Sequence, residues 1–183
     1  GDAVAVNDPS DMHRFLPALI SDPGRRREMS RRARVGVDGD GAGRVAAELQ
    51  YLAKLKFHQI NIADDLFTAK QDHCLAVCEE ILQKNLNINW TSFARVDTIS
   101  EELLSRMKAA GCTAVSFGIE SANRAILKTI KKVIRLDQIR QAVRMCLRVG
   151  ISPNASFILG LPGETRDTIR ETVSFANSLQ QEG

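Results

Sequence analysis

Two cysteines four residues apart, Cys74 and Cys78, stand in the stretch "HCLAVCEEI". Their spacing is half of an iron–sulfur cluster signature, and together with His73 they could instead form a zinc corner. The same spacing places both side chains along one face of a helix, and free cysteine is commonly buried in protein cores. The stretch therefore predicts a helix whose two cysteines pack in the core.

Charged residues follow four short apolar runs: Asp64 and Asp65, Arg95 and Asp97, Glu120, and Glu164. Ligands of parallel α/β proteins bind at the carboxyl ends of strands, so these positions are candidate site residues. Loops after strands are often polar only because they are solvated. A further alternative is a magnesium or manganese site made of carboxylates. Its ligands would be Asp64, Asp65, Asp97 and Glu120.

The elements that position these residues alternate along the chain. Short apolar runs predict strands over 57–63, 88–94, 113–119 and 154–160, and helical patterns lie over 69–85, 98–111, 123–130, 136–149 and 164–180. Ser100 is the expected N-cap of one helix, and Gly111 and Gly150 are expected at helix ends. The alternation indicates a parallel sheet with right-handed crossovers.

Four βα units are too few for an eight-stranded barrel, which takes about 250 residues. The prediction is an α/β fold: a partial TIM-type barrel of about four parallel strands, over residues 41–183. Its exposed sheet edge is a possible site of self-association. Residues 1–40 predict a separate helical segment with an arginine-rich stretch, Arg25–Arg34. We expect these arginines to form a solvated helix face and not a phosphate site.

Composition narrows the possible partners. Aromatic residues make up only 5% of the chain, which argues against a base-stacking nucleic-acid surface. No apolar run approaches the roughly 18 residues that span a bilayer, so no membrane is expected. Four scattered cysteines favour reduced thiols and a cytoplasmic location. The opening "GDAVAVNDPS" has neither an initiator Met nor a signal-peptide pattern, so we expect a longer parent chain.

Four segments, in order, carry a family resemblance: "IADDLFT", "WTSFARVD", "LLSRMKAAGCTAVSFGIESAN" and "FILGLPGET". Together they resemble the radical S-adenosylmethionine (SAM) superfamily, in the branch whose members often carry a cobalamin-binding domain. The resemblance covers about residues 44–178. It implies descent from a methyltransferase or cyclase that uses SAM and a [4Fe–4S] cluster, with cobalamin possible in the parent.

The resemblance also implies roles for residues at matching positions. Asp64 and Asp65 would lie near the amino end of SAM, and Arg95 would face the same cavity. Glu120 and Ser121 would contact the ribose or the methionine part. The adenine would pack against Ile158, Gly160 and Pro162, with Glu164 closing their turn. We expect Asp65, Arg95, Glu120 and this turn to line one concavity, with carboxylates crowded around the arginine.

The cluster loop of the family, Cys-x3-Cys-x2-Cys, is missing. It would precede the helix "GRVAAELQYLAKL", but no cysteine occurs before Cys74, and Ile81 stands where a third ligand after Cys78 would be needed. The resemblance therefore implies an incomplete radical SAM core that keeps a SAM-binding face and is inactive as this chain. The alternatives are a cluster-free module that binds SAM or another nucleotide, and a chimeric fragment without activity.

Residues 8–49 resemble a different protein, the carboxyl-terminal tail of nucleotide-sugar glycosyltransferase-like proteins. The two resemblances overlap near "GRVAAELQYL". A chimera joined at this helix would explain why the first strand and the cluster loop are both missing. The tail lacks a nucleotide pocket, so it implies no sugar-binding residues.

Overall fold

The computed structural model describes residues 9–36, 39–57, 59–64 and 66–182. The chain divides into two compact units, Gly1–Gly41 and Ala42–Gly183. Asp65, one of the predicted site residues, lies outside the described residues. Among the helices that the structure describes, none is both long and apolar enough to span a membrane.

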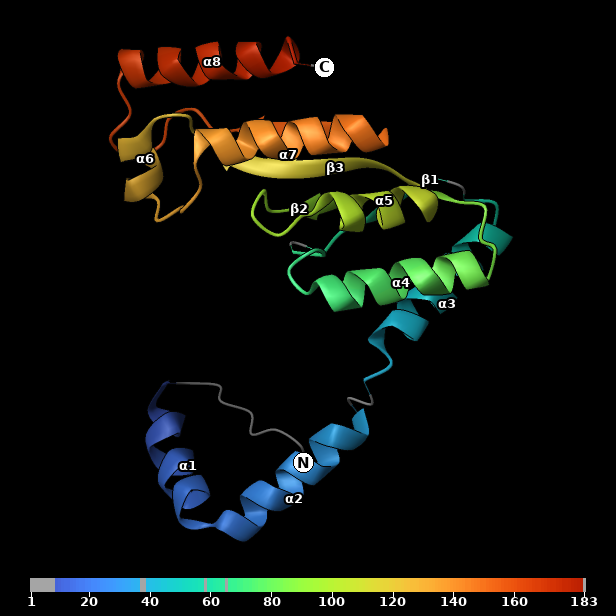
Figure 1. The fold of residues 1–183 in the computed structure, drawn as a ribbon. Coiled ribbons are helices and arrows are strands. Elements are labelled where there is room, and N and C mark those ends of the chain that lie inside the picture. The colour runs from blue at the N-terminus through green and yellow to red at the C-terminus, as the bar shows by residue number, and fades with distance from the viewer. Residues whose placement is uncertain (1–8, 37–38, 58, 65, 183) are drawn as a thin grey trace. The chain divides into compact units, whose positions relative to one another are not determined.

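The first unit contains helices α1 (Pro9–Ser21) and α2 (Pro23–Gly36) (Figure 1). At the start of α2, the Asp22 carboxylate accepts the Arg25 N–H at 2.8 Å, which satisfies one free donor of the helix end. The arginine side chains that the structure describes in α2 are exposed, and Glu28 pairs with Arg31 and Arg32. This agrees with the expected solvated helix face.

The second unit is a four-stranded sheet with helices. Its elements are α3 (Gly41–Lys54), β1 (Gln59–Ile62), α4 (Gln71–Gln83), β2 (Asn89–Ala94), α5 (Glu101–Ala109), β3 (Cys112–Glu120), α6 (Arg124–Thr129), α7 (Leu136–Val149), β4 (Ser152–Phe157) and α8 (Arg166–Gln180). The strands pair in the order β1-β2-β3-β4, and every pairing is parallel. The predicted α/β fold with four parallel strands is confirmed.

The two faces of the sheet differ because side chains alternate along each strand. On the helix-covered face, Trp90, Val115 and Phe117 are buried with the core residues of α5 and α7. Helix α5 lies between α4 and α7 and contacts both (Figure 1). The opposite side, here called the open face, carries the intervening strand residues, such as Phe93, which is 43% exposed.

The predicted helix ends are found. The Ser100 hydroxyl accepts the Leu103 N–H at 3.2 Å at the start of α5. Gly150 ends α7 in the left-handed conformation, with φ of 76°. Gly111 turns the chain from α5 into β3 with φ of 92°, and a Cβ there would lie 2.2 Å from the Ile88 carbonyl oxygen. Only glycine fits this crossing.

Strand β4 differs from its prediction. It covers Ser152–Phe157 and not 154–160, because the chain leaves the sheet after Phe157. The apolar pair Ile158 and Leu159 suggested a longer strand, yet these side chains are 48% and 56% exposed. Gly160 then adopts φ of 89°, a left-handed turn that no strand accommodates. The residues assigned to the end of this strand thus belong to its exit loop.

Candidate functional site

Because all four strands are parallel, their exits lie at one edge of the sheet. A cavity of about 330 Å³ opens there. Its lining residues are Leu66, Phe93, Ala94, Arg95, Ser116, Gly118, Glu120, Lys132 and Ser156. Two predicted site residues, Arg95 and Glu120, therefore share one cavity.

An ion pair crosses this cavity. Lys132 Nζ lies 2.9 Å from Glu120 Oε1, and the two side chains are only 28% and 22% exposed. The pair thus places an anionic and a cationic side chain next to each other in the cavity. Lys132 is not among the predicted site residues. It lies on the connection between α6 and α7 and not directly after a strand, where the sequence pattern places candidate residues.

The backbone around Glu120 is shaped for this pair. Glu120 has φ of 71°, in the left-handed region that costs a non-glycine residue roughly 1–2 kcal/mol. The β3–β4 register shifts between Gly118 and Glu120. A Cβ on Gly118 would lie 2.7 Å from Glu120 Oε1 and 3.2 Å from Lys132 Nζ. The glycine thus leaves the space that the two charged groups occupy.

The end of helix α6 determines the position of Lys132. Lys131 has φ of 58°, and its N–H donates to the Lys128 carbonyl at 3.0 Å. The Lys132 N–H donates to the Leu127 carbonyl at 2.9 Å. This pair of bonds closes the helix in the manner of a left-handed cap and fixes where Lys132 leaves it.

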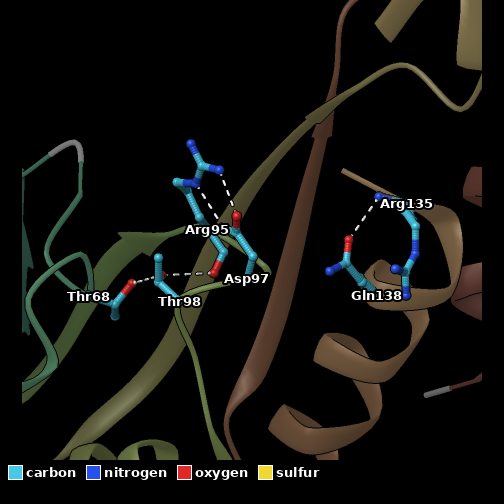
Figure 2. Close-up of polar contacts among 6 residues, drawn as sticks. All are labelled: Thr68, Arg95, Asp97, Thr98, Arg135 and Gln138. Atoms are coloured by element: carbon cyan, nitrogen blue, oxygen red, sulfur yellow. Dashed lines mark hydrogen bonds and ion pairs between the residues drawn. The ribbon is translucent and has the colours of Figure 1, made fainter. Parts of the chain in front are cut away.

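Arg95 has a different partner. Its guanidinium binds the Asp97 carboxylate through two hydrogen bonds of 2.8 and 2.7 Å (Figure 2). The arginine holds the pKa of Asp97 below its usual range. Among the described residues Arg95 thus pairs with Asp97 and Glu120 with Lys132. The expected crowding of carboxylates around one arginine is not found there, because a second cation, Lys132, stands in the cavity.

A chain of hydroxyl groups fixes the loop that carries Arg95. Thr68 Oγ1 lies 2.6 Å from Thr98 Oγ1, and the Thr98 hydroxyl donates to the Arg95 carbonyl at 3.1 Å (Figure 2). The Gln71 side chain also donates to the Thr98 carbonyl at 3.0 Å. The loops after β1 and β2 are thereby joined, so the backbone of Arg95 is held at the cavity rim.

Two predicted residues have local roles. The Asp64 carboxylate accepts the Leu66 N–H at 2.9 Å and so caps the turn after β1. Ser121 is fully buried, and its hydroxyl lies 3.2 Å from that of Thr172 and accepts the Asn123 N–H at 3.1 Å. The Ser121 side chain therefore points away from the cavity and ties the β3 exit to α8.

The turn after β4 adjoins the cavity through its backbone. The Ile158 N–H donates to the Glu120 carbonyl at 2.9 Å. Glu164 Oε2 accepts the N–H groups of Gly160 and Leu161, which closes the turn around the exposed Pro162. One loop beside Glu120 thus contains four predicted site residues, Ile158, Gly160, Pro162 and Glu164. None of them lines the 330 Å³ cavity.

Comparison with known proteins identifies the family. The model of the radical SAM superfamily matches residues 39–176. The chain belongs to the radical SAM superfamily.

Two curated relatives illustrate the likeness. An uncharacterized methyltransferase of Pyrococcus horikoshii is 37% identical over 142 residues, which cover 77% of this chain and 31% of that protein. The anaerobic magnesium-protoporphyrin IX monomethyl ester cyclase of Rubrivivax gelatinosus is 31% identical over 138 residues, covering 73% of this chain and 24% of the cyclase. The chain thus spans less than a third of the length of each of these two relatives.

Solved structures share the fold. The radical SAM methyltransferase TsrM of Kitasatospora setae, determined with cobalamin and a [4Fe–4S] cluster bound, superimposes with a TM-score of 0.70 at 21% identity. The match covers 76% of this chain and 29% of TsrM. The cobalamin-dependent radical enzyme OxsB matches with a TM-score of 0.63 at 20% identity, over 73% of this chain and 22% of OxsB. The four parallel strands are therefore part of a TIM-type barrel fold.

The radical SAM family implies a [4Fe–4S] cluster, which the cysteines of this chain do not fit. Cys74 and Cys78 are buried in helix α4, as predicted, while Cys112 and Cys146 are buried in β3 and α7. A hydrogen bond with Cys78, and then burial, raise the pKa of the Cys74 thiol, which opposes the thiolate form that metals bind. A [4Fe–4S] cluster of this family needs three cysteine ligands on one irregular loop, whereas these four cysteines lie in two helices and a strand.

The carboxylate alternative was a divalent-metal site from Asp64, Asp65, Asp97 and Glu120. Within the described part of the chain, no group of three or more His, Cys, Asp or Glu residues is placed to hold a metal ion. Asp97 and Glu120 each pair with a cation, which leaves little negative charge for a second one. Asp65 is not among the residues described.

Proposed function

We propose that this chain carries the SAM-binding face of a radical SAM enzyme and does not cleave SAM by itself. The observation that supports this proposal is the Glu120–Lys132 ion pair in a cavity with Arg95 at the carboxyl edge of the sheet. SAM carries a carboxylate, an ammonium, a sulfonium and two ribose hydroxyls. A cavity with cationic and anionic groups side by side complements such a ligand.

Each charged residue has a distinct task in this proposal. Lys132 and Arg95 supply cations for the SAM carboxylate. Glu120 accepts hydrogen bonds from the ammonium or from the ribose hydroxyls and counters the positive sulfonium. The exposed Ile158 offers an apolar surface for the adenine. When a cluster is bound to a complete family member, it supplies the electron that cleaves SAM, and the residues of this chain would only bind and orient SAM.

Calorimetric titration with SAM and with S-adenosylhomocysteine tests the binding site. Glu120→Gln and Lys132→Met should each weaken binding about tenfold, because each removes one charge-assisted contact. Glu101→Gln is the matched control, since Glu101 forms an ion pair of 2.7 Å with Arg148 on the surface, where both side chains are 53% exposed. Equal effects at Glu101 and Glu120 would reject the site.

The second candidate is a cluster-free module that binds SAM or another nucleotide, and the misfit of the cysteines favours it. Both candidates require that this chain alone holds no cluster, and anaerobic reconstitution with iron and sulfide tests that requirement. We expect no stable [4Fe–4S] cluster on this chain alone. Near-stoichiometric iron with broad visible absorbance would contradict that expectation and would restore a complete radical SAM enzyme.

The activity of a longer parent protein is a further proposal. Methyl transfer or cyclisation is the reaction class that the curated relatives suggest. Cobalamin is bound in the TsrM and OxsB structures, and we assign no residue of this chain to it. The four free cysteines support a reducing, cytoplasmic setting. The proposal that residues 8–49 come from a glycosyltransferase-like tail rests on their sequence resemblance alone.

Self-association is proposed at the exposed edge of β4. Asn154 and Ala155 are exposed on this edge strand, whose outer backbone groups no described strand pairs. A lysine on an edge strand opposes pairing with a second strand. Ala155→Lys should therefore lower any dimer fraction in sedimentation velocity at high protein concentration, whereas Gln83→Lys on α4 should not.

A further inference from the structure

Helix α2 concentrates positive charge. Six of its fourteen residues are arginine, and Glu28 is the single acidic residue among them. The helix therefore carries more positive charge than the chain as a whole, whose net charge is +3. A concentration of like charge on one element is typical of surfaces that bind polyanions. The structure describes five of these arginine side chains, and all are exposed: Arg25, Arg26, Arg27, Arg31 and Arg32.

The arginines lie on two flanks of α2. Arg26 marks the side that faces α1, because its guanidinium donates to two carbonyls in the last turn of α1. Successive residues of a helix are about 100° apart around its axis, so Arg25 and Arg32 lie together on one flank. By the same geometry Arg27 and Arg31 lie together on the opposite flank. The side of α2 that faces away from α1 is thus bordered by two rows of arginine.

Glu28 stands between the two rows. Its carboxylate accepts hydrogen bonds from Arg31 at 2.8 and 2.9 Å and from Arg32 at 2.7 Å. The bonds from Arg31 and then from Arg32 lower the pKa of Glu28 to about 2, so the carboxylate is ionised at neutral pH. Because it binds one arginine of each flank, Glu28 links the two rows.

From the two rows we infer that α2 binds double-stranded DNA through the phosphates that border the major groove. A helix with its side chains is about 10–12 Å across, and the major groove of B-form DNA is about 12 Å wide. A helix in this groove has a row of phosphates on each side, so arginines on both flanks find partners.

This partner is compatible with the composition of the chain. Contacts to phosphates need no aromatic rings, so the low aromatic content argues only against binding by base stacking. The sequence alone predicted a solvated helix face at Arg25–Arg34. In this inference the arginine side chains that the structure describes there are solvated until DNA displaces the water and the counterions around them.

An anionic membrane is the competing partner, and the arrangement of α2 opposes it. A helix that lies on a membrane carries its basic residues on one face and apolar residues on the other. In α2 the arginines occupy both flanks, and Met29 and Val35 are the only large apolar residues of its sequence. A membrane would instead use Leu16 and Ile20 of α1, which are 44% and 70% exposed.

Fluorescence anisotropy of a labelled DNA duplex of about 20 base pairs, titrated with the full chain, tests the inference. We expect a micromolar dissociation constant at about 50 mM salt. The logarithm of the affinity should fall with the logarithm of the salt concentration with a slope of roughly −3 to −4, because four flank arginines each contribute about −0.9. An RNA duplex of the same sequence should bind several-fold more weakly, since its major groove is deep and narrow.

Three double variants that each lack two positive charges separate the groove from mere attraction of charge. The control uses two arginines of α7 and α8 that are 60% and 75% exposed. Each flank variant should weaken DNA binding at least tenfold and reduce the size of the salt slope by about 2, whereas the control should change the affinity less than twofold. The variants are Arg25→Gln with Arg32→Gln, Arg27→Gln with Arg31→Gln, and the control Arg144→Gln with Arg170→Gln.

Loss of affinity in only one flank variant would overturn the inference, because a helix on a flat surface uses one side. An equal loss in the control would overturn it as well. A third contrary result is binding to vesicles with phosphatidylserine as tight as binding to DNA and lost in Leu16→Ser with Ile20→Ser. That result would assign the helices to a membrane.

Glu28→Gln covers the case in which a flank variant loses helix content in circular dichroism. Glutamine and glutamate have similar helix propensity, and the change removes the one negative charge between the two rows. DNA binding should therefore tighten about threefold, a gain that unfolding would not produce. Unchanged or weaker binding of Glu28→Gln would reject a phosphate-binding surface on α2.

Discussion

On the helix-covered face of the sheet, Trp90, Phe117 and Ile119 are at most 1% exposed and belong to one hydrophobic core. On the open face, strand neighbours of the same chain are amides, hydroxyls and a half-exposed phenylalanine, Phe93. Both faces are built by the same four strands, and residues one position apart lie on opposite sides.

The difference shows how stability and binding are divided between the faces. Apolar burial contributes about 25 cal/mol per Å², and here the helices α4, α5 and α7 provide the surface that buries it. The open face contributes little to this burial, so its residues are free to be polar. The charged cavity lies at the carboxyl edge of the same face, where Glu120 and Lys132 stand.

The largest expected effect comes from one residue type on the two faces. Phe117→Ala should lower the free energy of unfolding by about 3–5 kcal/mol, because it leaves a cavity in the core. Phe93→Ala should lower it by less than about 1 kcal/mol, as most surface changes do. Urea denaturation of both variants measures the difference. Similar losses would show that the open face is also part of a packed core.

A pH titration tests whether water reaches the side chains buried on the helix-covered face of the sheet. Burial raises the pKa of Cys112 and that of Cys146 to about 12, from an ordinary value of 9.0. Unfolded thiols lose protons above pH 9, whereas the folded ones keep theirs up to pH 12. The folded state then binds more protons, so stability falls as the pH rises through this window.

The expected size of this fall follows from the shift. Each thiol should reduce the free energy of unfolding by roughly 1 kcal/mol between pH 8 and pH 10. Cys146→Ala should make the fall smaller by that amount, after its constant cavity cost is subtracted. Urea denaturation at pH 8 and pH 10 measures the fall in the free energy of unfolding for both proteins. Ser156→Ala, on the open face, is the control. An unchanged fall in Cys146→Ala would mean that water reaches the thiol.

Periodicity and cap residues predicted much of the fold. Helix α7 begins and ends where its pattern does, Leu136–Val149, and the parallel strand order followed from the alternation of elements. The placement of Arg95 and Glu120 at one edge followed from the same rule. These are properties of whole segments, and hydrophobic patterning reports them well.

Local backbone conformation explains what the sequence did not reveal. Glu120 adopts a left-handed conformation, and after it Ser121 points into the core instead of the cavity. The left-handed Lys131 directs Lys132 toward Glu120. A left-handed conformation at glutamate or lysine has no pattern in the sequence, because glycine is its usual marker. The pairing of Arg95 with Asp97 likewise depends on one loop conformation.

The smallest expected effect compares two serines. Ser92 lies on the helix-covered face, is 1% exposed, and its hydroxyl has no hydrogen-bond partner in the described part of the chain. Removing a buried unsatisfied hydroxyl relieves its desolvation cost, so Ser92→Ala should leave stability unchanged or raise it by up to about 1 kcal/mol.

Ser116 is the matched position on the open face, where water can hydrate its hydroxyl. Ser116→Ala should therefore change the free energy of unfolding by no more than about 0.5 kcal/mol in either direction. Thermal and urea denaturation of both variants provide the measurement. A loss above about 1 kcal/mol in Ser92→Ala would mean that its hydroxyl is bonded, which would place a polar partner or a water inside the helix-covered layer. In that case hydroxyl groups on both faces would have hydrogen-bond partners, and the two faces would differ mainly in whether helices cover them.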